Sequence, residues 1–473
     1  MMGRSPFAAR WTKVAAAWLP FADAATVELP LPRLLRLALF QVSVGMTLVL
    51  LNGVLNRVMI VELGVPAGLV ALMIALPLLF APARALIGHR SDHHRSILGW
   101  RRVPYLWFGT LLQFGGLAIM PFALLLMSRP DAAAAGTAAA ALAFLLTGAG
   151  IHTTQTAGLA LATDLAPADS RPRTVALLYV MLLVGMMVSA FLMGGLLTDF
   201  TPTKLVQVVQ GVALLSIVFN LVALWKQEAR NPAATRNNAP RPPFAELWSA
   251  FVADPAARRL LVAVGLGAAA FSMQDALLEP YGGEVLGMSV GGTTHLTGLW
   301  ALGNLVGFAA AARWLGAGDD PHRVAGLGGI AGLFALTTVL FAAPLNSGLL
   351  LSVGAAGIGL GAGLFLVGTL TAAMGLARDG RSGLALGAWG AVQASAAGLA
   401  ILLGGLLRDL IGSLALAGGL GSTLAHGATG YGIVYLVELL LLFATLVVLG
   451  PLVARRVSPS AEPARFGLTQ FPA

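Results

Sequence analysis

Cysteine is absent from the sequence, which excludes disulfide bonds and thiolate metal sites. Charge is also scarce, because Asp, Glu, Lys and Arg together make up 10% of the residues, whereas a soluble globular domain carries about 25%. The chain contains no P-loop, no GxSxG motif and no HExxH motif. Nothing in it indicates a soluble enzyme, and we expect no enzymatic activity.

Long apolar segments fill most of the chain instead, since 58% of the residues are hydrophobic and the mean hydropathy is +0.84. A helix needs about 20 apolar residues to cross a hydrocarbon core about 30 Å thick. In lipid the backbone must satisfy its own hydrogen bonds, so such segments are helices. We predict an all-α membrane protein with twelve transmembrane helices, at 34–61, 66–88, 103–128, 133–165, 172–198, 204–226, 259–281, 291–314, 323–344, 347–376, 382–410 and 429–453.

The basic residues are distributed unevenly between the two sides of these helices. With both termini in the cytoplasm, 25 of the 29 Lys and Arg residues lie on the cytoplasmic side and four on the outer side. This asymmetry is what the positive-inside rule requires of an even number of spans. The net charge of +9 therefore predicts contact with anionic lipids of the inner membrane, and no nucleic-acid partner.

Polar and proline-containing stretches divide the chain into five parts. Phe7, Trp11 and Trp18 recur at helical spacing, which predicts a helix lying at the cytoplasmic interface, with an unstructured tail as the alternative. Prolines and asparagines interrupt the chain again after the sixth span. We predict an amphipathic interfacial segment at 1–32, a six-helix bundle at 33–227, a cytoplasmic linker at 228–257, a second six-helix bundle at 258–455 and a cytoplasmic tail at 456–473.

The two bundles resemble each other in sequence. Residues 158–171 read GLALATDLAPADSR, and residues 368–381 read GTLTAAMGLARDGR. Each run leads from the inner end of a span through an acidic turn to an arginine that opens the next span. Two parallel six-helix repeats, related by an axis along the membrane normal, are the arrangement of the major facilitator superfamily. We therefore expect that fold, with a 6+6 pseudo-twofold.

The loop after the second span resembles the signature loop of major facilitators. Gly88 is followed four residues later by Asp92, and then by Arg95, Arg101 and Arg102. A carboxylate at a helix end can pair with arginines and form a charge latch between the halves on the cytoplasmic side. The run here reads DHHRS and departs from the tight Asp-Arg-x-Gly-Arg pattern of that superfamily.

The fourth span carries the most polar run within any span, HTTQT at 152–156. His152 and Gln155 are three residues apart and share a helix face. A neutral imidazole at this depth could bind a metal or a metallated ring, or could relay protons. A cluster of interhelical hydrogen bonds is the structural alternative.

The seventh span carries two carboxylates near its outer end. Asp275 and Glu279 are four residues apart and share a face. Together they could bind a cation or a proton, and each could instead pair with Arg57 or Arg408.

Other polar residues lie at membrane depth in this sequence. Arg57 is near the outer end of the first span, where it can snorkel and pair with Glu62. His295 is near the outer interface, and Glu438 is deep enough to need a partner that the sequence does not name. Arg57 and Glu438, together with Asp275 and Glu279, form a candidate intramembrane polar or ion site.

Long runs of the sequence resemble the PucC/LhaA family of purple phototrophic bacteria, also called the bacteriochlorophyll delivery family. They include HTTQTAGLALATDLAP and MQDALLEPYGGEVLGMSVGGTTHLT, and they lie at 21–67, 75–92, 98–125, 152–167 and 273–297. The resemblance implies a major facilitator fold and a place in the inner or intracytoplasmic photosynthetic membrane. It implies a light-harvesting complex assembly factor that delivers bacteriochlorophyll to antenna polypeptides of light-harvesting complex 1 (LH1), and less strongly of light-harvesting complex 2 (LH2). The implied partners are LH1 polypeptides, the reaction centre, bacteriochlorophyll synthase and membrane lipids, with carotenoid or another lipid as a further ligand.

A bacteriochlorophyll carrier needs an apolar slot and one axial donor to the magnesium. Among the histidines away from the cytoplasmic loops, we assign this role first to His152, with Gln155 as a hydrogen-bond donor to ring carbonyls. His295 is second, and His426 lies in the last outer loop. No protein side chain is expected to bind a metal ion other than this magnesium.

Two other functions remain open at this point. The first is a proton-coupled secondary transporter of a small solute, driven through Asp275, Glu279 or Glu438. The second is a pigment-free membrane scaffold that binds antenna helices through glycine-rich faces.

Overall fold

The computed structural model describes residues 24–26, 29–79, 100, 102–167, 170–228, 253–375 and 382–453. Within these ranges every regular element is helical. The predicted interfacial helix, most of the linker and the tail lie outside the described residues, so those predictions stay untested.

The N-terminal half contains a helix in each of the first six predicted spans, and the helix ends lie within a few residues of the prediction where the structure describes them. The first span starts with α2, which begins before the predicted position because Pro32 fits the first turn of a helix, where its missing N–H costs nothing. These helices are α2 (Leu31–Leu48), α3 (Ala67–Leu79), α5 (Val103–Met127), α6 (Ala133–Leu165), α7 (Arg171–Leu196) and α8 (Pro202–Leu224).

The C-terminal half repeats this arrangement. Its first span is broken into α10 (Pro255–Ser272), the 3₁₀ turn η5 (Met273–Ala276) and α11 (Leu278–Glu284). The other five spans are α12 (Val290–Gly316), α13 (Pro321–Ala342), α14 (Gly348–Gly375), α15 (Ser382–Leu416) and α16 (Ala428–Leu449).

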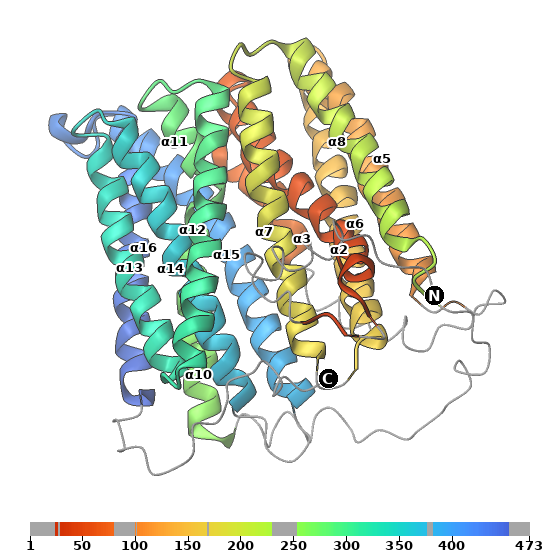
Figure 1. Ribbon diagram of the computed structural model, residues 1–473. Coiled ribbons are helices and arrows are strands. Elements are labelled where there is room, and N and C mark those ends of the chain that lie inside the picture. Colours follow the sequence, from red (N-terminus) through yellow and green to blue (C-terminus); the bar gives the residue numbers. More distant parts are fainter. Residues whose placement is uncertain are drawn as a thin grey trace.

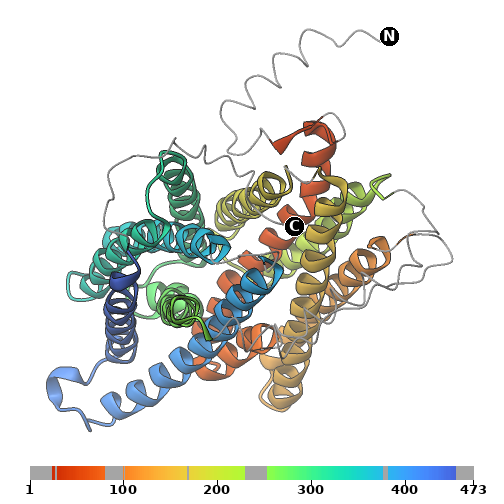
Figure 2. The same cartoon turned by 90° about the horizontal axis from the view of Figure 1, so that it is seen from below.

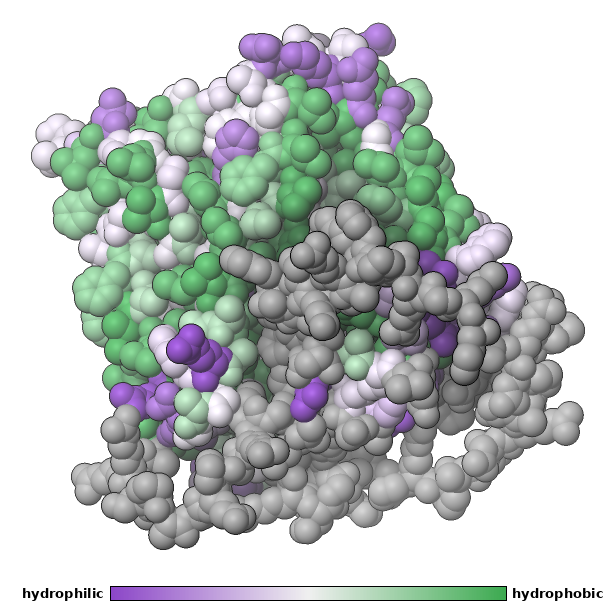
Figure 3. Space-filling view, in the orientation of Figure 1, coloured by the Kyte–Doolittle hydropathy of each residue, from purple (hydrophilic) through white to green (hydrophobic). Residues whose placement is uncertain are grey.

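All twelve predicted spans are present as helices. In the described part of the chain, 11 helices are long and apolar enough to cross a membrane, and the remaining span is α3, of which 67–79 are described. Apolar side chains cover the middle of the visible face, and hydrophilic ones gather at its upper end (Figure 3). Large hydrophobic side chains such as Phe122, Phe334 and Leu440 are exposed on the molecule, as lipid contact requires.

An even number of crossings returns the chain to the side on which it started. We call the end that carries 63–66, 285–289 and 417–427 the outer end, following the orientation predicted from the basic residues. It is uppermost in Figure 1.

The two groups of six helices stand side by side, red to yellow in one and green to blue in the other (Figures 1 and 2). They meet where α3 packs on α15 and where α7 packs on α12. Small residues bring the backbones together: a Cβ on Gly405 would lie 2.8 Å from the carbonyl oxygen of Ala67. The halves are therefore closely packed along two lines.

The first and seventh spans are irregular at the same level. After α2 the first span continues as two π-helical stretches, η2 (Val49–Leu55) and η3 (Val58–Glu62), and the seventh span breaks at η5. The Asn56 amide nitrogen donates to the carbonyl oxygens of Asn52 and Ala276, each at 2.9 Å. One side chain of the N-terminal half thus satisfies a backbone group freed by the break in the C-terminal half.

Candidate functional site

His152 lies on α6, is partly buried, and lines a cavity of about 60 Å³ between α6, α3 and the first span. Asn52 and Pro77 line the same cavity. Pockets for drug-sized ligands are about 300–1,000 Å³, so a tetrapyrrole ring would need these helices to move apart. The assignment of His152 as an axial ligand stays a prediction.

Gln155 and its neighbours form hydrogen bonds within the N-terminal half. The Gln155 amide donates to the Gln41 side-chain oxygen on α2 at 3.3 Å. The hydroxyls of Thr153 and Thr156 donate to backbone carbonyls one turn earlier, each at 2.7 Å. The Gln155–Gln41 bond links α6 to α2, as the interhelical alternative requires, whereas the two threonine bonds lie within α6.

His295 lies near the outer end of α12, at the contact between the two halves. Its ring centroid is 5.6 Å from that of Phe191 on α7. A Cβ on Gly194 of α7 would lie 2.5 Å from its Nε2. A ring bound to His295 would have to separate α7 from α12, and its assignment as a second axial ligand also stays a prediction.

Glu279 is almost fully buried, with 3% of its surface exposed. One carboxylate oxygen accepts a hydrogen bond from the Thr297 hydroxyl on α12, and the other has no partner among the described residues. Asp275 is hydrogen-bonded to Ser272 and lines a cavity of about 180 Å³ that Glu279 does not line. The break at η5 separates the two carboxylates, which an unbroken helix would have placed on one face.

Glu438 on α16 is fully buried, and the structure supplies the partner that the sequence could not name. One of its oxygens accepts the backbone N–H of Gln274 at 2.7 Å. Its second oxygen has no hydrogen-bond partner in the described part of the chain. Glu438 therefore satisfies a backbone donor exposed by the break in the seventh span.

Arg57 pairs with Glu62, as predicted from their spacing. It also donates to the carbonyl oxygen of Met288 in the C-terminal half at 3.2 Å. With 4% of its surface exposed, Arg57 is buried between the halves, which corrects the expectation that it snorkels to the interface. The contacts with Glu62 and with the Met288 carbonyl explain the difference, because they satisfy the guanidinium without exposure at the interface.

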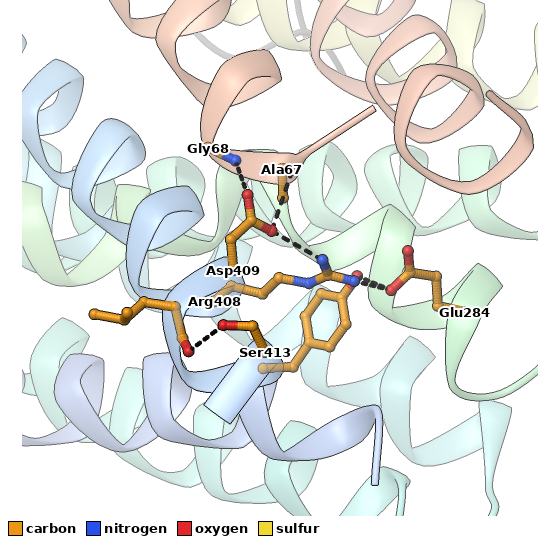
Figure 4. Close-up of polar contacts among 8 residues, drawn as sticks. Ala67, Gly68, Glu284, Arg408, Asp409 and Ser413 are labelled. Carbon is orange, nitrogen blue, oxygen red and sulfur yellow. Dashed lines mark hydrogen bonds and ion pairs between the residues drawn. The ribbon is translucent and has the colours of Figure 1, made fainter. Parts of the chain in front are cut away.

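A second polar cluster at the outer end involves Arg408, Asp409, Glu284 and Tyr431 (Figure 4). Arg408 pairs with Glu284 and with Asp409, and its guanidinium lies 4.7 Å from the Tyr431 ring centre. The Tyr431 hydroxyl donates to Glu284 at 2.7 Å. Arg408 thus pairs with Glu284 and Asp409, whereas the sequence offered Asp275 and Glu279 as its partners.

The predicted charge latch is described only in part, since Asp92, Arg95 and Arg101 lie outside the described residues. Arg102 is 5% exposed, and its Nε donates to Asp164 of α6 at 3.0 Å. The carboxylate of Glu228 accepts the backbone N–H of Arg102 at 3.0 Å. Sequence reasoning missed both acids, although Asp164 stands within the repeated run at 158–171.

Three larger cavities lie elsewhere in the described residues. A cavity of about 180 Å³ inside the C-terminal half carries polar groups on its wall, among them Asp275, Asn304 and Gln393. An apolar groove of about 340 Å³ lies between α7 and α8. Another of about 470 Å³ lies between α11, α13 and α16, with His426 at its rim.

Comparison with known proteins gives a family match over most of the chain. The model of the family described as "PUCC protein" matches residues 54–457. The chain is 56% identical over 467 residues to the "Uncharacterized protein in puhA-bchM intergenic region" of Rhodobacter capsulatus, covering 97% of this chain and 98% of the relative. It is 51% identical to "Protein PucC" of the same organism, covering 96% and 99%. The "Bacteriochlorophyll synthase 44.5 kDa chain" of that organism is 29% identical, covering 89% and 96%.

Solved structures show the same fold at low sequence identity. A bacterial homolog of the human lysosomal transporter Spinster, in an inward-facing and unoccupied conformation, has a TM-score of 0.68 at 15% identity, covering 90% of this chain and 98% of that one. The peptide transporter POT in complex with sulfate has a TM-score of 0.65 at 14% identity, covering 93% and 98%. These proteins are transporters of the major facilitator type, and the predicted fold is confirmed.

Proposed function

The chain belongs to the PucC family, and on that premise we propose that it is an assembly factor of photosynthetic light-harvesting complexes. In this role it binds bacteriochlorophyll within the membrane and hands it to antenna polypeptides. The observation that carries the proposal is the family match over 54–457, which includes nearly all of the membrane-embedded chain.

The cavities of the molecule are consistent with an apolar cargo. The two larger ones, of about 340 and 470 Å³, have mainly apolar walls and border side chains exposed on the flank of the bundle, such as Leu192 and Leu436. A ring with a hydrocarbon tail can reach such grooves sideways from the lipid, without crossing the centre of the protein. Cofactor sites generally combine apolar walls with a few placed polar groups.

The partners follow from the same role. We propose that the chain serves LH1 before LH2, and that it contacts antenna polypeptides, the reaction centre and bacteriochlorophyll synthase. The exposed apolar side chains of α5, α7 and α13 provide lipid-facing surface on which single transmembrane helices could pack.

Proton-coupled transport is a second candidate function, favoured by one observation. Asp275 lines the cavity of about 180 Å³ together with Asn304, whose side-chain oxygen has no hydrogen-bond partner among the described residues. A small polar solute could bind there. Proton flux into vesicles that depends on solute and is lost in Asp275→Asn would select this function.

The test is to delete the gene in a phototrophic host and to purify the tagged protein from the same host in a mild detergent. We expect reduced LH1 assembly after deletion, and a preparation that absorbs as bacteriochlorophyll and contains LH1 polypeptides. A colourless preparation with LH1 polypeptides would select a scaffold. A colourless preparation without them would refute the proposal.

A further inference from the structure

His426 lines the groove of about 470 Å³ between α11, α13 and α16. It lies in the turn between η6 (Ser422–Leu424) and α16, and its side chain is exposed. Its backbone N–H donates to the carbonyl oxygen of Leu424 at 2.8 Å, and its own carbonyl accepts the N–H of Thr429 at 3.1 Å. The imidazole is thus attached to a hydrogen-bonded turn at the start of a long helix.

The hydrogen bonds of Thr429 favour one tautomer of this imidazole. The Thr429 hydroxyl donates its one hydrogen to the carbonyl oxygen of Leu424 at 2.7 Å. The same oxygen lies 3.3 Å from His426 Nδ1, and with its hydrogen directed at Leu424 it accepts from that nitrogen. This arrangement favours the tautomer of a neutral His426 that carries its proton on Nδ1, which leaves the lone pair of Nε2 available to a metal.

The groove that His426 lines is apolar and large. Its walls come from α11, α13 and α16, with Leu340, Ile433 and Leu436 among the lining residues. Tyr281 also lines it, and its hydroxyl donates to the carbonyl oxygen of Val339 and accepts the N–H of Ala343. Its volume of about 470 Å³ falls within the usual range for cofactor-sized ligands.

We propose that His426 is the axial ligand of a metal-containing tetrapyrrole ring that lies in this groove. The proposal rests on the proposed function and names its pigment site. A neutral imidazole with a free Nε2, whose Nδ1–H is hydrogen-bonded to a second residue, is the usual form of a metal-binding histidine. A lipid acyl chain could fill the groove without that nitrogen, whereas a metallated ring uses both the nitrogen and the apolar walls.

The position differs from those of the two histidines favoured by the sequence. The cavity beside His152 is about 60 Å³, and His295 lies between α7 and α12. His426 alone among these three stands beside a space of cofactor size in the described structure. Its place in a loop made it the least conspicuous of them in the sequence.

The test uses full-length protein in lipid nanodiscs, titrated with bacteriochlorophyll a and with metal-free bacteriopheophytin a. We expect the unmodified protein to bind the magnesium ring at least about 10-fold more tightly, with the absorption change of axial ligation. His426→Gly should abolish this preference, and added imidazole should restore it. Thr429→Val, which removes the tautomer-fixing acceptor, should cost about 10-fold in affinity for the magnesium ring. His322→Ala, at the opposite end of the bundle, is the control.

The possible outcomes separate the site from the function. Equal binding of both rings, unchanged in His426→Gly, would show occupation of an apolar groove only and would overturn the proposal. Loss of the preference in His152→Ala or His295→Ala, with His426→Gly unaffected, would overturn this site and leave the proposed function standing. Binding of neither ring by the unmodified protein would refute the proposed function itself.

Discussion

Asp409 on α15 accepts a hydrogen bond from the backbone N–H of Gly68 on α3, with a distance of 2.7 Å. Its other oxygen accepts the N–H of Ala67 at 3.2 Å. The first N–H groups of a helix have no partner within it, and the helix dipole favours a negative charge there. A carboxylate of the C-terminal half thus caps a helix of the N-terminal half at the outer end.

Replacing this cap should weaken the outer contact between the halves. We expect Asp409→Ala to lower the free energy of unfolding by about 1–2 kcal/mol, the usual cost of losing a helix cap. The measurement is thermal unfolding in detergent. Asp199→Ala is the matched control, because that side chain is 91% exposed at the same end and its nearest cation, the Lys204 ammonium, is 3.8 Å away. If the two substitutions lower the unfolding free energy equally, Asp409 does not stabilise the protein by capping α3.

Arg408 provides a second prediction, because it joins two carboxylates and an aromatic ring. Arg408→Lys keeps the charge but loses the planar fork and the stacking on Tyr431. We expect it to cost about 1–3 kcal/mol of unfolding free energy, as for hydrogen bonds to charged groups. Arg323→Lys is the control, since the exposed pair of Arg323 with Asp319 contributes at most about 1 kcal/mol. If Arg408→Lys and Arg323→Lys have the same unfolding free energy, the contacts of Arg408 do not stabilise the outer end.

The difference between what was predicted and what was missed follows from how far apart the partners are in the chain. Apolar runs and basic loops report local structure, so the helices were placed to within a few residues. Arg57 and Glu62 are five residues apart, and their pair was predicted. Asp409 and Gly68 are 341 residues apart. That contact depends on how the halves pack, which no local pattern encodes.

The sequence also could not predict side-chain hydrogen bonds to backbone groups, such as the bond between Glu438 and the N–H of Gln274. The partner of Glu438 is an N–H group that becomes available only because the seventh span breaks at η5. The sequence showed a deep acid and predicted that it needed a partner, but it did not show the break. For the same reason Asp275 and Glu279 were expected on one face, although they have separate surroundings.

The contact of Glu438 leads to a third prediction. Glu438→Gln keeps an oxygen that can accept the N–H of Gln274, whereas Glu438→Leu leaves this buried donor without a partner. We expect Glu438→Leu to cost about 1–3 kcal/mol more than Glu438→Gln, measured as unfolding in detergent. If both variants unfold alike, the carboxylate does not serve the backbone. A role in proton coupling would then be the better account of its burial.

The contact between α7 and α12 yields the last prediction, which tests how firmly the two halves are joined. A Cβ on Gly291 would lie 3.0 Å from the backbone nitrogen of Thr198 and closer still to the carbonyl oxygen of Gly194. Backbone atoms cannot turn aside as a side chain can, so Gly291→Ala should force α12 away from α7, at a cost of about 1–3 kcal/mol. Gly195→Ala on α7 is the control, because Gly195 is exposed and nothing lies within 4 Å of its Cβ position.

Thermal unfolding would give the energetic cost, and cross-linking between cysteines introduced into the otherwise cysteine-free chain would report the separation of α7 from α12. We expect Gly291→Ala to reduce both stability and cross-linking, and Gly195→Ala to change neither. If Gly291→Ala leaves both unchanged, the halves separate here at little cost. In that case His295 becomes accessible to a ring, and a moving transporter-like cycle explains the chain better than a fixed carrier surface.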